Sequence, residues 1–124
     1  MKKVLLVGNC NFDAPQIKSV IENNYQAEVK DIKTIDEAKM ILENEDIDLV
    51  LVNRVGDQDQ KNGLDLVDYL ANKGGKPPII RITNCQEKMD EAVLHGALEG
   101  FGKEDILNDE GLETVKNILN PILK

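Results

Sequence analysis

The sequence has no tryptophan, and aromatic residues make up only 3% of its 124 residues. We therefore do not expect the stacking of bases on aromatic side chains that single-stranded nucleic-acid binding uses. Basic residues are also in the minority, since 15 Lys and Arg stand against 23 Asp and Glu and leave a formal net charge of −8. Phosphate backbones and anionic membranes attract clustered Lys and Arg, so we expect neither nucleic acid nor a membrane as a partner.

Cysteines and long apolar runs are equally scarce. Cys10 and Cys85 are too few for a disulfide framework and favour a reducing compartment. The first apolar run stops at Gly8, short of the roughly 7–15 residues of a signal peptide, and no run reaches the ~20 residues of a membrane span. We expect a soluble cytoplasmic protein with one domain over residues 1–124 and no output domain.

Short apolar segments alternate with helical patterns along the chain. The unbroken run Leu49–Val52 is typical of a strand buried on both faces of a parallel sheet. Thr34 and Glu37 form a capping box, and a final amphipathic helix is expected to bend or end near Pro121. The alternation predicts an α/β fold, a doubly wound five-stranded parallel sheet in the order 2-1-3-4-5. The expected strands are 3–8, 27–32, 48–53, 79–83 and 97–101.

Asn53 directly follows the central strand of this predicted sheet. Open α/β folds place their sites just past the carboxyl ends of the strands, so Asn53 lies at the functional position. An amide is nonetheless a poor substitute for the carboxylate that nucleophilic chemistry would use there.

The whole chain resembles a response-regulator receiver domain, a family of chemotaxis-regulator-like signalling proteins. The resemblance implies a flavodoxin-like three-layer sandwich and a place in bacterial two-component signal transduction. It rests on segments 4–7, 48–53, 63–66, 78–83, 96–97 and 102–103.

The resemblance also implies a phosphorylation pocket, which is degenerate here. Receivers bind Mg²⁺ through an acidic pair after the first strand, and those positions are Gly8 and Asn9. The phosphoryl-accepting aspartate is replaced by Asn53, while Thr83 and Lys103 keep the family's hydroxyl and amine. Without carboxylates the pocket lacks a nucleophile and the ligands that Mg²⁺ prefers. We expect no catalytic residue, metal or cofactor, and hence a pseudo-receiver rather than an enzyme.

Such a domain would act as a phosphorylation-independent protein-interaction module. The resemblance implies protein partners, or a homodimer, on the face of the fourth helix, fifth strand and fifth helix. Gly100 stands where receivers have an aromatic switch residue, with Phe101 beside it. Phe101 could anchor a partner, or it could fill the gap between the last two helices.

A different class of function is a small-anion or metabolite sensor that uses Lys103, Asn9, Asn53 and Thr83. Lys103 could contact the anion, or it could instead hydrogen-bond Asn53, Asn9 or backbone carbonyls and hold the loop shut.

A third hypothesis is an active receiver that uses another acid, and Asp13, Asp48 and Asp57 are the candidates. Asp48 lies at the wrong end of the central strand for this role. Asp57 and Asp59 suggest a calcium loop, but Lys61 takes the place of the third ligand, which favours a solvated loop.

Cys10, Cys85 and His95 could in principle form a metal or redox site. The two cysteines follow strands that are not neighbours in the predicted order, so they lie beyond disulfide reach. Small packing residues are therefore the preferred interpretation of both cysteines.

Overall fold

The computed structural model describes residues 1–8, 13–53 and 63–124. Four parallel strands form one sheet in the order β2-β1-β3-β4. They are β1 (Lys2–Val7), β2 (Ala27–Ile32), β3 (Leu49–Val52) and β4 (Ile79–Arg81). The helices are α1 (Asp13–Asn24), α2 (Ile35–Asn44), α3 (Gly63–Asn72), α4 (Gln86–His95), α5 (Lys103–Ile106) and α6 (Asp109–Leu123).

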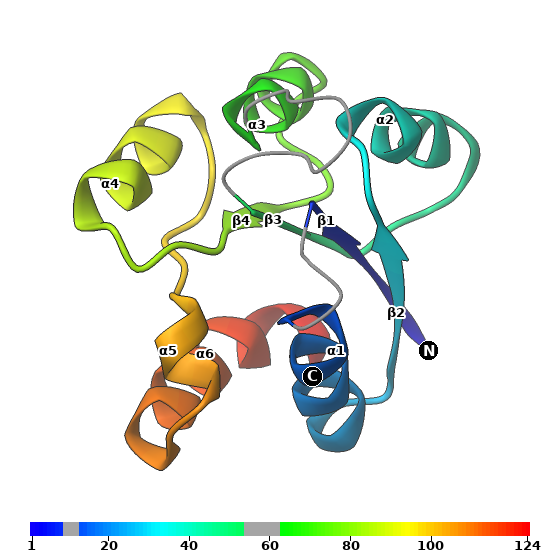
Figure 1. Ribbon diagram of the computed structural model, residues 1–124. Coiled ribbons are helices and arrows are strands. Elements are labelled where there is room, and N and C mark those ends of the chain that lie inside the picture. The colour runs from blue at the N-terminus through cyan, green and yellow to red at the C-terminus, as the bar shows by residue number, and fades with distance from the viewer. Residues whose placement is uncertain (9–12, 54–62) are drawn as a thin grey trace.

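The helices cover both faces of the sheet, which gives the predicted three layers. In Figure 1, α2, α3 and α4 lie on one side of the strands, and α1, α5 and α6 lie on the other. All four residues of β3 and all three of β4 are buried, as expected for parallel strands with helices on both faces. In β2, buried and exposed residues alternate because this strand forms one edge of the sheet.

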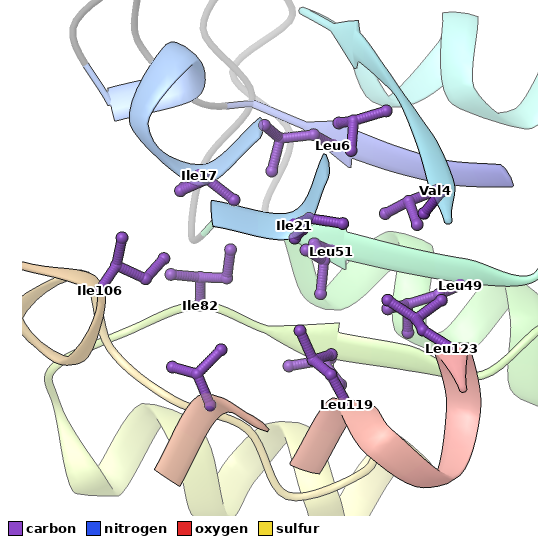
Figure 2. Packing of buried hydrophobic residues seen from close by; sticks show 14 of the residues in the cluster. Val4, Leu6, Ile17, Ile21, Leu49, Leu51, Ile82, Ile106, Leu119 and Leu123 are labelled. Atoms are coloured by element: carbon purple, nitrogen blue, oxygen red, sulfur yellow. The ribbon is translucent and has the colours of Figure 1, made fainter. Parts of the chain in front are cut away.

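Alternate residues of the central strands feed two separate cores. Val4, Leu6, Leu49 and Leu51 pack with α1 and α6, as Figure 2 shows for Ile17, Ile21, Leu119 and Leu123. Leu5, Val7, Val50 and Val52 face the opposite way and pack with α2 and α3. The period of two along each buried strand therefore divides the apolar residues between both helical layers.

Local capping signals define several helix ends. The Thr34 side chain accepts a hydrogen bond from the Glu37 amide at 3.1 Å, so Thr34 is the predicted N-cap of α2. Helix α4 ends at His95 and is followed by the C-cap residue Gly96, whose φ of 122° suits a residue without a side chain. Within the described ranges, no helix is both long enough and apolar enough to span a membrane.

The prediction of a fifth strand over 97–101 is wrong, because this segment does not form a strand in the structure. Segment 97–101 lies at the expected place beside β4, but only Leu98 forms a bridge, with Ile80. The Leu98 amide donates to the Ile79 carbonyl at 2.9 Å, whereas the Gly100 amide contacts Met89 Sδ at 3.3 Å. A helix side chain thus takes the hydrogen bond that would have continued the ladder.

The C-terminal region differs from the prediction in one further way. The short helix α5 was not expected, and it begins where the Asp105 carboxylate accepts a hydrogen bond from the Gly102 amide at 2.9 Å. Helix α6 continues through Pro121 and ends two residues later, at Leu123. Leu119 and Leu123 are both buried, and packing of this last turn offsets the hydrogen bond that proline cannot donate.

Candidate functional site

Gly8 and Asn53 lie next to each other at the carboxyl edge of the sheet. Strands β1 and β3 pair with Val7 opposite Val52, and the Asn53 amide donates to the Val7 carbonyl at 2.9 Å. Gly8 is buried, its amide bonds the Ile32 carbonyl, and its φ of 76° lies in the left-handed region that favours glycine. The parallel topology therefore brings together these two positions of the predicted pocket.

Thr83 lies at the same edge, just beyond β4. The Ile82 amide donates to the Val52 carbonyl at 2.8 Å, which brings the end of β4 beside the end of β3. The Thr83 hydroxyl accepts a hydrogen bond from the Cys85 amide at 3.1 Å, and its own amide bonds the Phe101 carbonyl. The hydroxyl therefore shapes the turn into α4.

Lys103 is the first residue of α5 and is half-buried. It lines a small space between α5 and α1, together with Gln16 and Ile17. The bond between Thr83 and Phe101 brings the start of α5 to the same end of the sheet as Gly8 and Asn53. Three of the predicted pocket positions thus share the sheet edge, and Lys103 borders it. Asn9 lies outside the described residues.

A hollow of about 220 Å³ opens beside Thr83, between the start of α4 and the start of α5. Its charged lining residues are all acidic, namely Glu99, Glu104 and Asp105. Three carboxylates create a negative potential, so this hollow repels small anions. Within the described ranges, no group of three His, Cys, Asp or Glu residues has the arrangement of a metal site.

Phe101 is buried, with only 2% of its surface exposed, and it belongs to the core shared by α1 and α6. Its ring therefore fills the interior and is not available to a partner at the predicted surface of Gly100 and Phe101. Gly100 is close-packed as well, because a Cβ there would come within 2.4 Å of Ile80 Cγ2. Position 100 thus has no room for an aromatic switch side chain in this conformation.

Cys85 and His95 occupy opposite ends of α4. Cys85 is the exposed N-cap and His95 is the last residue, which separates them by about 15 Å at 1.5 Å per residue. His95 Nδ1 instead lies 2.7 Å from Asp68 Oδ1 on α3. A metal site shared by Cys85 and His95 is excluded, and the expected packing role of Cys85 is wrong because this side chain is exposed. Cys10 lies outside the described residues.

The other acidic candidates add little at this edge. Asp48 accepts a hydrogen bond from the Lys3 amide at 2.8 Å and precedes β3, so it lies at the opposite end of the sheet as expected. Asp13 is the first residue of α1. Asp57, Asp59 and Lys61 lie outside the described residues.

Arg81 is a feature of this region that the sequence analysis missed. It is the last residue of β4 and is completely buried, which is rare for arginine. Its Nη1 atom lies 3.3 Å from the Lys88 carbonyl and 3.3 Å from Glu91 Oε1, both on α4. A single charged residue within the apolar run Ile79–Ile82 could have signalled this contact, because a buried charge needs partners.

Comparison with known proteins defines the fold of this chain. No family model matches the sequence, and none of the curated proteins matches it. Solved structures do match, and the chain has the fold of response-regulator receiver domains.

Three of these structures illustrate the match. A response regulator from Thermotoga maritima is 22% identical with a TM-score of 0.75, and the alignment covers 97% of this chain and 98% of that one. The beryllofluoride-activated receiver domain dimer of NtrC4 is 19% identical with a TM-score of 0.73, covering 98% and 99%. NtrX from Brucella abortus is 16% identical with a TM-score of 0.72, and 96% of this chain spans only 29% of that protein.

Proposed function

We propose that this protein is an atypical receiver of two-component signalling that works by contact with a protein partner and without phosphorylation. The observation that carries the proposal is the amide of Asn53 at the end of β3, beside Gly8 at the end of β1. Receivers need carboxylates at both places, one to accept the phosphoryl group and the others to hold Mg²⁺. A neutral amide provides neither the nucleophile nor the charge.

The remaining pocket residues support a structural role. The Thr83 hydroxyl holds the turn into α4, and Lys103 is half-buried where α5 meets α1. Signalling would then depend on which protein docks on the domain, and the domain itself would be no enzyme. The face formed by α4, segment 97–101 and α5 is our candidate for that contact, since exposed apolar side chains gather there, among them Leu94 and Leu98.

A backbone amide NMR titration with Mg²⁺, followed by Mg²⁺ with beryllofluoride as an acyl-phosphate mimic, tests this proposal. We expect no localised shifts at Gly8, Asn53, Thr83 and Lys103. Saturating shifts at these residues would overturn the phosphorylation-independent mechanism. The matched control is Asn9→Asp/Asn53→Asp, which restores carboxylates at two of the positions where receivers carry them. This variant should gain a response to Mg²⁺ at millimolar concentration.

The alternative function is the sensing of a small anion by Lys103 with Asn53 and Thr83. The amine of Lys103 at the border of the sheet edge favours it, whereas the three carboxylates of the adjacent hollow oppose it. Inorganic phosphate would raise the melting temperature if it bound the folded state, and Lys103→Ala would abolish that rise. We expect phosphate to leave the melting temperature unchanged.

A further inference from the structure

A groove lies between α4 and the segment that follows it, and we call it the α4 groove. Its lining residues are Met89, Asp90, Val93, Leu94 and Glu99, and its volume is about 290 Å³. In Figure 1, α4 and the segment that follows it lie at the β4 end of the sheet, away from β2.

Apolar side chains in and beside the groove are unusually exposed. Leu94 is 85% exposed, Val93 is 42% exposed, and Leu98 next to Glu99 is 44% exposed. Such neighbouring apolar groups, bordered by polar ones, are typical of protein interaction sites. They would provide the anchoring contact of a docked partner.

The charged residues that border these apolar groups are acidic. Asp90 and Glu99 line the groove, and its lining residues include no Lys or Arg. The imbalance extends along this region, because residues 86–110 contain eight Asp and Glu but only two Lys and Arg. The carboxylates therefore act together on whatever approaches.

Self-association through this groove would bring like charges together. A two-fold contact places the same patch of each copy against the other, so the acidic groove of one copy would lie against the acidic groove of its partner. Like-charge juxtaposition at an interface is unfavourable, whereas opposite potentials speed encounter and select partners. The groove thus suits a partner whose apolar residues are flanked by basic ones.

We infer that the α4 groove binds a basic, apolar-anchored segment of a different protein rather than a second copy of this chain. The inference rests on the proposed function as an interaction module, and it specifies the chemistry of the partner. Leu94, Val93 and Leu98 would take the apolar side chains, and Asp90 and Glu99 would pair with Lys or Arg.

The test uses two amidated peptides with helical spacing, one of Lys and Leu and one in which Glu replaces every Lys. We expect the Lys/Leu peptide to shift the amides of Asp90, Val93, Leu94 and Glu99 saturably in NMR, and to bind about tenfold more weakly at 0.5 M than at 0.05 M salt. The Glu/Leu peptide should produce no such shifts. Sedimentation of the protein without peptide should show a monomer.

Two charge-reversal variants make the result decisive. Asp90→Lys/Glu99→Lys should weaken binding of the Lys/Leu peptide at least about tenfold. Asp46→Lys/Glu113→Lys makes the same change in net charge, at exposed positions before β3 and on α6. This variant should bind the Lys/Leu peptide with an affinity within about twofold of the wild type. Equal weakening by both variants would overturn the inference, because it would show attraction to net charge alone. A dimer that Leu94→Glu dissociates would also overturn it.

Failure of this inference can be told apart from failure of the proposed function. A response of Asn53 and Thr83 to Mg²⁺ with beryllofluoride would disprove the phosphorylation-independent mechanism, even if the Lys/Leu peptide bound at the α4 groove. Conversely, a silent pocket combined with a groove-mediated dimer would leave the proposed mechanism standing and disprove the basic partner.

Discussion

The two edges of the sheet are built very differently. At the β2 edge, six residues pair in register with β1, and charged side chains have nearby counter-ions. Lys30 Nζ lies 2.8 Å from Glu45 Oε1, and Lys33 Nζ lies 3.2 Å from Asp31 Oδ2. At the other edge, segment 97–101 has a single bridge to β4, and Asp90 and Glu99 line a groove that has no basic residue in its lining.

This difference separates a structural edge from one that is available for contact. Charged side chains along β2, and the hydrogen bond that the Val29 amide donates to the Glu22 carboxylate at 3.1 Å, leave the β2 edge little to offer another protein, which is how proteins protect exposed strands. The opposite edge combines exposed apolar groups with carboxylates, and such a surface binds favourably to a partner of complementary charge. Gly8 and Asn53, the neutral residues at positions where receivers have carboxylates, lie at the carboxyl ends of the strands. Their neutrality therefore does not change the charge of this edge.

The largest effect should come from removing the aromatic ring beneath the irregular edge. Phe101→Ala leaves a cavity in the core and should lower the free energy of unfolding by about 3–5 kcal/mol. Leu98→Ala, at the half-exposed neighbour, is the control and should cost under about 1 kcal/mol. Urea denaturation measures both changes. An unchanged urea midpoint for Phe101→Ala would show that the ring is not part of the core and would favour the other expectation, a partner anchor.

A smaller loss is expected at the point where the edge leaves the sheet. In Gly100→Ala the new Cβ would lie 2.4 Å from Ile80 Cγ2 and 3.0 Å from the Arg81 carbonyl oxygen. Ile80 is fully buried and has no space to retreat, so overpacking should cost about 1–3 kcal/mol. The urea midpoint should fall while the slope stays constant. A variant as stable as the wild type would show that this contact relaxes freely.

Most of the fold could be predicted because its signals are local. The unbroken run of β3, the alternation in β2 and the Thr34 cap each depend on residues close together in the sequence. The fifth strand failed because Met89 takes the Gly100 hydrogen bond, a contact between residues eleven positions apart. The short helix α5 depends likewise on its packing against α6 and on the Asp105 contact.

The site could be predicted to a similar degree. Parallel topology alone brings Gly8, Asn53 and Thr83 to one edge, so their grouping followed from the strand order. Burial of individual side chains did not follow, because it depends on which elements meet in space. For this reason the sequence left Phe101 between two roles and gave no warning of the contacts that Arg81 makes with α4.

The smallest effect should be a pH dependence at the protected edge. The hydrogen bond from Lys30 lowers the pKa of Glu45 below its usual 4.5, and the same contact raises the pKa of Lys30. A lowered carboxyl pKa contributes stability that is present above the unfolded-state pKa and is lost as the pH falls through the folded-state value. NMR titration of the Glu45 carboxyl carbon should therefore give a higher pKa in Lys30→Gln than in the wild type. Because both side chains are partly exposed, 0.5 M salt should narrow that difference. Equal pKa values in both proteins at low salt would show that the charges of the β2 edge are not coupled.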